Sequence, residues 1–173
     1  ERFLASTCRD ALEKATAKTE VIAVLDGYWP SADEIVPGVQ YLHRGEARGM
    51  RAAINGGVAV ANGDFIFKLD GHCLLSEGYD TELANTCRED WVVVPRRKRL
   101  DAENWCVQET GKPDIDYMYL SYPDDPADFG GKGLNGKVWD TQNRDENLRG
   151  VEVDDLMSAQ GSGWFMPRPY FYA

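Results

Sequence analysis

A carboxylate and an imidazole stand two residues apart, directly after a short apolar run. The run covers residues 65–69, and the two side chains belong to Asp70 and His72. A run of this length is typical of a buried strand, and ligands of open α/β sheets bind beyond the carboxyl ends of strands. In extended chain, residues i and i+2 point to the same side, and Gly71 between them allows close approach. The spacing therefore predicts that Asp70 and His72 bind one divalent metal ion.

The two side chains favour Mn²⁺ or Mg²⁺ as the ion. Carboxylates and water suit hard cations, and a single imidazole shifts the preference toward Mn²⁺. The chain has only two histidines, so a structural zinc site is not expected. An Asp-x-His triplet is also common as a strand-end turn with a solvated carboxylate. The residues before it decide between the two interpretations.

The segment before the strand, residues 49–64, has helical periodicity. Its apolar residues fit one face of a helix and are Met50, Ala53, Ile54, Val58 and Ala61. A glycine turn at Gly63 then leads into the predicted strand. Helix, turn and strand together resemble the nucleotide-sugar glycosyltransferases of the GT-A fold, whose pattern is roughly G-x-x-x-A-x-N-x-G-x-x-x-A-x-G-[ED], a hydrophobic strand, then D-x-D or D-x-H. The general layout is similar to family 2 transferases, and the D-x-H followed by Cys73 resembles polypeptide N-acetylgalactosaminyltransferases.

The donor side of the site is expected at two further positions. Residues 20–27 form a near-continuous apolar run that closes on Asp26, which indicates a buried parallel strand ending in a carboxylate. The resemblance implies that Asp26 binds the nucleoside and that Arg51 and Asp70 contact the donor. On the residues alone, Asp26 also suits a turn before Gly27, and Arg51 suits a solvated helix position.

The acceptor side is expected near the end of the chain. Residues 160–171 resemble the glycine-containing segment before an Arg-x-x-Phe pattern, which lines the sugar and acceptor side in the family. The residues assigned to that side are Gly161, Ser162, Gly163 and Trp164. A flexible glycine turn is the alternative interpretation, although Trp164 and Phe165 suit a wall on which a sugar stacks.

Periodicity predicts an α/β fold. Helices are expected at 2–17, 49–61 and 77–86, and strands at 20–27, 39–43, 65–69 and 91–95. Strands that alternate with helices predict a mostly parallel, Rossmann-like sheet flanked by helices, which agrees with a GT-A fold. Length predicts a single GT-A-like domain over residues 1–173.

Within this domain, residues 1–94 are expected to form the nucleotide-sugar-binding half and residues 157–173 the start of the acceptor-side segment. Residues 95–156 are expected to be a loop-rich insertion with a possible strand at 117–122. In this insertion the basic run 96–99 suits a solvated loop or a contact with diphosphate or an acidic acceptor, and Asp154 with Asp155 suits the start of a helix. The resemblance implies a first strand before residue 2 and a catalytic base beyond Ala173. The chain is therefore expected to be part of a larger catalytic domain.

Composition restricts the partners. The formal net charge of −10 argues against nucleic acid and anionic membranes, which repel an acidic protein. No apolar run approaches the length of a membrane span. The four cysteines lack C-x-x-C spacing, which indicates reduced thiols and a cytoplasmic location.

These observations predict a metal-dependent glycosyltransferase. A divalent cation that bridges diphosphate oxygens stabilises the leaving group without proton transfer. The resemblance implies a nucleoside-diphosphate sugar as donor, with UDP favoured, and a saccharide or other hydroxyl compound as acceptor. Two other functions stay open: a non-catalytic module that binds nucleotide or glycan, and a nucleotidyltransferase.

Overall fold

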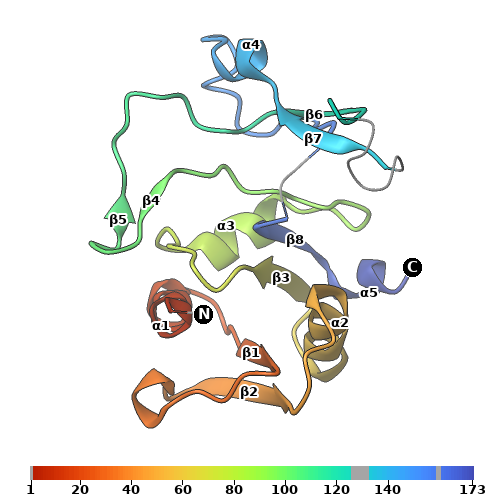
Figure 1. Ribbon diagram of the computed structural model, residues 1–173. Coiled ribbons are helices and arrows are strands. Elements are labelled where there is room, and N and C mark those ends of the chain that lie inside the picture. The colour runs from red at the N-terminus through yellow and green to blue at the C-terminus, as the bar shows by residue number, and fades with distance from the viewer. Residues whose placement is uncertain (1, 126–132, 159–160) are drawn as a thin grey trace. The chain divides into compact units, whose positions relative to one another are not determined.

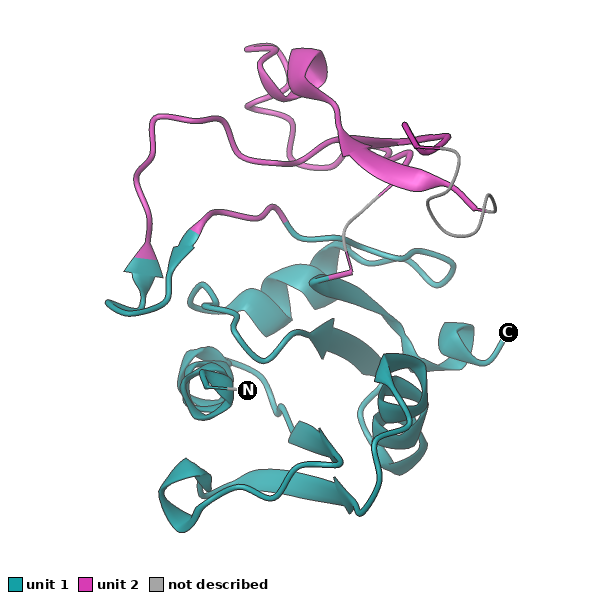
Figure 2. Cartoon of the chain, viewed as in Figure 1, with its two compact units in different colours: residues 1–95, 100–106, 162–173 teal, residues 96–99, 107–161 magenta. Residues whose placement is uncertain are grey.

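The computed structural model describes residues 2–125, 133–158 and 161–173. The chain divides into two compact units (Figure 2). The first unit comprises residues 1–95, 100–106 and 162–173, and the second comprises residues 96–99 and 107–161. The last segment of the chain thus returns to the unit in which the chain begins.

The N-terminal part of the first unit is a helix packed on a parallel pair of strands (Figure 1). Its elements are α1 (Leu4–Lys14), β1 (Val21–Asp26), the short 3-10 helix η1 (Ala32–Glu34) and β2 (Val39–Arg44). β1 and β2 pair in register from Val21 opposite Val39 to Asp26 opposite Arg44. Cys8 of α1 is buried against Ala23 and Val36, because the apolar residues of α1 recur at helical spacing and form one face.

The rest of the first unit is built around an antiparallel pair. Its elements are β3 (Phe65–Leu69), α3 (Tyr79–Thr86), β8 (Gly163–Pro167) and α5 (Arg168–Phe171), whereas α2 (Met50–Val60) packs on β1. β3 pairs with β8, with Leu69 opposite Gly163. A second cluster of buried side chains, formed by Tyr79, Leu83 and Phe165, joins α3 to this pair. The two-residue strands β4 (Leu100–Asp101) and β5 (Cys106–Val107) come after α3 and before β6 in the sequence.

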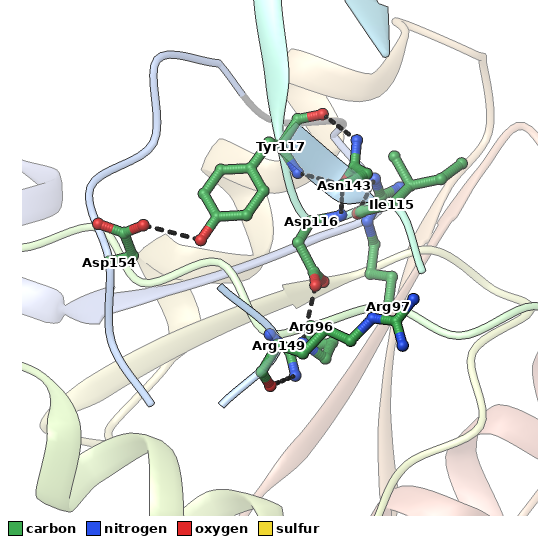
Figure 3. A network of polar contacts seen from close by, with 8 residues as sticks. All are labelled: Arg96, Arg97, Ile115, Asp116, Tyr117, Asn143, Arg149 and Asp154. Atoms are coloured by element: carbon green, nitrogen blue, oxygen red, sulfur yellow. Dashed lines mark hydrogen bonds and ion pairs between the residues drawn. The ribbon is translucent and has the colours of Figure 1, made fainter. Parts of the chain in front are cut away.

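The second unit contains the antiparallel strands β6 (Met118–Ser121) and β7 (Asn135–Val138), followed by the short helix α4 (Asp140–Asn143). Asn143 is buried and organises the unit (Figure 3). Its Oδ1 accepts hydrogen bonds from the backbone N–H groups of Asp116 and Tyr117, and its Nδ2 donates to the carbonyls of Tyr117 and Trp139. One side chain therefore links α4 to the start of β6.

The arginines of the basic run 96–99 bind other residues of the second unit. Arg96 Nε lies 2.9 Å from Asp116 Oδ2, and Arg96 Nη1 donates to the carbonyl of Arg149 (Figure 3). Arg97 donates to the carbonyl of Ile115, and Arg99 to that of Pro113. The prediction of a loop at 96–99 is confirmed, since these residues form no helix or strand and Arg96 and Lys98 are exposed. The loop is not fully solvated, because the guanidinium groups of Arg97 and Arg99 bind backbone carbonyls of the segment before β6.

Most predicted elements of the first unit are present, with shifted ends. The predicted helix 2–17 spans Leu4–Lys14 and ends where Ala15 becomes extended. The predicted helix 77–86 begins at Tyr79, after Gly78 in the left-handed conformation with φ 69°. The expected parallel pattern is present in β1–β2, whereas β3 pairs antiparallel with β8.

Two predicted elements were wrong. Residues 91–95 do not form a strand: Val93 exchanges two backbone hydrogen bonds with Phe165, both 2.8 Å long, and Val92 is half exposed. A valine run favours a strand, but only one of its residues meets the free edge of β8. Among the described residues 155–158, directly after Asp154, no helix begins. The Oδ2 of Asp154 accepts the hydroxyl hydrogen of Tyr117 at 2.7 Å, and its Oδ1 accepts the backbone N–H of Asp155 at 2.8 Å.

None of the helices within the described ranges has both the length and the apolar character that a membrane crossing requires.

Candidate functional site

The end of β3 brings the predicted metal ligands beside the predicted acceptor segment. The N–H of Asp70 donates to the carbonyl of Ser162 at 3.0 Å, which extends the β3–β8 pairing one step past Leu69 and Gly163. Asp70 therefore lies next to Ser162, although the two are far apart in the sequence. Of the acceptor-side residues, Ser162, Gly163 and Trp164 belong to the first unit, whereas Gly161 belongs to the second.

The carboxylate of Asp70 has a cationic neighbour on its own strand. Lys68 and Asp70 are two residues apart in extended chain, and Lys68 Nζ forms an ion pair with Asp70 Oδ1. The Lys68 side chain is almost buried, at 8% exposed, whereas that of Asp70 is 33% exposed. His72 is exposed. The pair thus fixes one carboxylate oxygen while the Asp70 side chain stays accessible from solvent.

The two predicted metal ligands, Asp70 and His72, offer one carboxylate and one imidazole. In the parts of the chain that the structure describes, no three His, Cys, Asp or Glu side chains gather into a group able to hold an ion. A closed protein cage is therefore not present among these residues. Mg²⁺ and Mn²⁺ fit an open set of this kind, because Mg²⁺ usually keeps several waters and takes one or two carboxylates with substrate phosphates.

The loop that follows Asp70 and His72 is held by α1. Thr7 Oγ1 accepts the N–H of Cys73 at 2.9 Å, and Asp10 Oδ2 accepts the N–H of Leu75 at 2.5 Å. Lys14 Nζ donates to the carbonyl of Leu75 at 2.6 Å and lies 2.7 Å from Asp10 Oδ1. Thr7 and Asp10 are buried, at 5% and 7% exposed.

Sequence reasoning did not assign a role to Thr7, Asp10 or Lys14. In sequence, Asp10 and Lys14 are an ordinary i, i+4 pair. The signal that could have found them is the position of the Asp10 carboxylate on the face that α1 buries, beside Thr7 and Ala11. Cys73, whose N–H is one of the tethered groups, is half-buried, and burial raises the pKa of its thiol.

At the other strand pair, Asp26 shapes the loop between β2 and α2. Its Oδ2 accepts the backbone N–H groups of Arg48 at 2.9 Å and Gly49 at 2.7 Å. Its Oδ1 lies 3.7 Å from Arg44 Nη1, directly across the β1–β2 pair. Gly27 follows with φ 78°, and a Cβ there would lie 2.8 Å from the backbone nitrogen of Ala47. Loop and strand end therefore pack backbone against backbone.

A cavity of about 470 Å³ opens on this loop. Residues lining it are Arg44, Gly45, Glu46 and Arg48. Arg44 also donates to the carbonyl of Ala52 in α2 at 2.5 Å, so its guanidinium joins strand, loop and helix. Arg51 is exposed on the first turn of α2. The lining contains two arginines and the carboxylate of Glu46, and the N–H groups of Arg48 and Gly49 before α2 are bound by Asp26.

The Arg-x-x-Phe pattern contacts the turn before β3. Arg168 Nε donates to the carbonyl of Gly63 at 2.7 Å, and the Arg168 N–H donates to the carbonyl of Asp64. The ring of Phe171 stacks on that of Trp164, with centroids 6.2 Å apart. One face of Trp164 is thus packed against α5. Gln160, which begins the predicted acceptor segment, lies outside the described residues.

A comparison with protein families identifies the family of this chain. The family model described as "Glycosyl transferase family 2" matches residues 1–132. The chain belongs to glycosyl transferase family 2. A comparison with curated proteins found no match.

Membership of this family confirms the predicted transferase class and the GT-A α/β fold. Family 2 transferases bind a nucleotide sugar and an acceptor, and they transfer a glycosyl group. The matched residues include Asp26, Arg51, Asp70 and His72 but stop before the segment 161–164. Within the described strands of this family 2 domain, β1–β2 and β3–β8 are separate pairs, so no shared sheet joins Asp26 to Asp70.

Proposed function

We propose that this protein transfers a sugar from a nucleoside-diphosphate sugar, with UDP favoured, to a hydroxyl group of a saccharide or other acceptor. The observation that carries the proposal is the end of β3. There Asp70 and His72 follow the strand, Gly163 of β8 lies opposite Leu69, and Ser162, just before β8, accepts the N–H of Asp70. Groups suited to a metal and a segment suited to an acceptor thus occupy one strand end in a family 2 transferase.

Asp70 and His72 are the residues that would hold Mn²⁺ or Mg²⁺ in this proposal. When bound, such an ion supplies electrostatic stabilisation of the diphosphate leaving group. Lys68 fixes the rotamer of Asp70 through their ion pair. The bond from Asp70 N–H to Ser162 fixes the backbone at the same residue. The carboxylate is therefore held in place before any ligand arrives, which lowers the entropic cost of binding.

Asp26 contributes to the donor side by shaping the loop at 45–49. Its carboxylate orders the backbone of Arg48 and Gly49, beside the cavity that Arg44 and Arg48 line. The arginines and Arg51 supply positive charge that favours a nucleotide. On the acceptor side we assign Gly161, Ser162, Gly163 and Trp164. The tryptophan offers the aromatic surface on which a sugar ring can stack.

Calorimetric titration of UDP and UDP-sugars, with Mn²⁺ and with chelator, tests the donor site. We expect binding that needs the metal and is lost in Asp70→Ala and His72→Ala. Asp90→Ala, which removes an exposed carboxylate elsewhere in the first unit, should bind as the wild type does. Circular dichroism verifies that each variant is folded. Binding that persists in both ligand variants, or in chelator, would contradict the metal assignment.

Product formation separates transfer from binding alone. With a UDP-sugar and a panel of saccharide acceptors, a transferase releases UDP in proportion to the glycosylated product. Metal-dependent binding without release of UDP would instead favour a non-catalytic nucleotide-binding module.

A further inference from the structure

Three side chains of α1 form a clasp on the backbone that follows His72. The clasp consists of Thr7, Asp10 and Lys14, which are spaced along one side of the helix. Together they bind the N–H of Cys73 and both the N–H and the carbonyl of Leu75. Three polar backbone groups of a short loop are thus satisfied by a helix more than 60 positions earlier in the chain.

The clasp is rigid because its members are themselves held. Asp10 is buried and has two partners, the Leu75 N–H through one oxygen and Lys14 through the other. The helix that carries them is fixed from the other side by Tyr79, whose buried hydroxyl donates to the carbonyl of Ala11 at 3.0 Å. A helix that is held in this way positions the loop more precisely than the loop's own contacts would.

The same loop is tethered at its other end. The Asp70 N–H is bound to Ser162, so the backbone is fixed at residue 70 on one side and at 73 and 75 on the other. His72 lies between these anchors. Its imidazole thus sits on a two-residue span whose ends are set by β8 and by α1.

We propose that Thr7, Asp10 and Lys14 are positioning residues that set the metal affinity of Asp70 and His72. They act through the backbone of residues 73–75 and contact no ligand themselves. This inference rests on the proposed function, in which Asp70 and His72 hold the ion. Partners that hydrogen-bond metal ligands directly typically change metal affinity by roughly 10–100-fold when removed. The clasp holds the neighbouring backbone instead, so we expect an effect at or below the lower end of that range.

The test uses Thr7→Val, which keeps the shape of the side chain and removes the oxygen that accepts the Cys73 N–H. Titration with Mn²⁺, followed through the electron paramagnetic resonance signal of the free ion, should show affinity weakened severalfold, up to roughly tenfold. Thr7→Ser restores the hydroxyl and should restore the affinity. Lys14→Met, at a partly exposed position, should weaken binding in the same direction.

Asp80→Asn is the matched control for a loss of stability alone. Asp80 of α3 accepts hydrogen bonds from the backbone of Thr16 and Ala17, just after α1, and does not touch the loop. We expect this variant to lose stability in urea denaturation while it binds Mn²⁺ as the wild type does. If Thr7→Val and Asp80→Asn change the affinity equally, or if Thr7→Val leaves it unchanged, the clasp has no positioning role.

The design separates this inference from the proposed function. When the wild type and Asp70→Ala bind Mn²⁺ alike, the assignment of the metal ligands fails and the positioning role fails with it. When binding needs Asp70 but Thr7→Val binds like the wild type, only the positioning role fails. Hydrogen exchange at the Cys73 amide, measured without metal, verifies that the substitution has released the loop.

Discussion

Asp26 uses one carboxylate oxygen to hold two consecutive backbone N–H groups and turns the other toward Arg44. A carboxylate committed in this way orders the chain around the cavity at residues 44–48. At the scale of a residue, the donor-side role that we propose for Asp26 is therefore exerted largely through the shape of the loop. The neighbouring Gly27 serves the same loop, because Ala47 approaches where a side chain would lie.

Gly27→Ala should destabilise the protein and loosen this loop. The residue has φ 78°, a region that costs an L-residue about 1–2 kcal/mol, and the added Cβ would lie 2.8 Å from Ala47 N. Urea denaturation should therefore show a loss of more than about 2 kcal/mol, since the contact adds to the conformational cost.

Gly78→Ala is the control for conformation without a close contact. Gly78 has φ 69° in the left-handed region, and the nearest atom to a Cβ placed there is Thr16 Oγ1 at 3.6 Å, an ordinary contact distance. Its loss of stability should stay near the conformational cost of about 1–2 kcal/mol. Equal losses in the two variants would show that Ala47 moves aside freely and that the close packing at Gly27 does not matter.

Residue types and spacing were sufficient to find Asp70 and His72 at a strand end, and the resemblance assigned residues 161–164 to the acceptor side. The structure brings Asp70 and Ser162 together by strand pairing. The clasp on α1 was not predictable in the same way. A threonine or an aspartate on a helix has the same local pattern whether it faces water or binds a distant backbone, and only the tertiary contact distinguishes the two.

At the scale of elements, Asp80 connects α3 to the segment that follows α1. Burial alone would raise the pKa of Asp80, but the N–H groups of Thr16 and Ala17 with the Thr19 hydroxyl outweigh it and lower the pKa to about 2. The unfolded chain, with an ordinary carboxyl pKa near 3.8, then binds the proton more tightly than the folded protein does. The contribution of Asp80 to stability is thus complete above pH 4 and is lost as the pH falls toward 2.

Asp80→Asn should therefore be less stable than the wild type at neutral pH, and the difference should shrink between pH 4 and pH 2. Chemical denaturation at a series of pH values measures both. Asp90→Asn, at an exposed position, is the control for removal of a charge. A stability difference that is constant down to pH 2 would show that the hydrogen bonds of Asp80 do not depend on its charge.

Elements with a clear period and a partner nearby in sequence were predicted well. β1 and β2 pair directly along the chain, and β3 follows α2 after a glycine turn. The run at 91–95 was not, because a strand is defined by its pairing and only Val93 meets a partner, Phe165. Sequence periodicity shows which side chains of a segment share a face, but it does not show whether a neighbouring strand has a free edge with which the segment can pair.

At the scale of the whole molecule, the chain folds into two compact units, and the family match extends from the first into the second. The second unit depends on Asn143, which supplies four hydrogen bonds to backbone groups around β6 and α4 (Figure 3). A protein with separate cooperative units need not unfold in a single step. Stability can therefore be lost in one unit while the other is kept.

Asn143→Ala tests this independence. The substitution leaves the N–H groups of Asp116 and Tyr117 without their acceptor, at a cost of about 1–3 kcal/mol for each buried group. Hydrogen exchange should then speed up at the amides of β6, β7 and α4, while those of α1 and β1 keep their protection. Asn147→Ala, at an exposed asparagine whose Nδ2 bonds only to Asp145 among the described contacts, should change neither set. Equal acceleration in both units would mean that they unfold as one, because the loss of a contact in the second would then open the first.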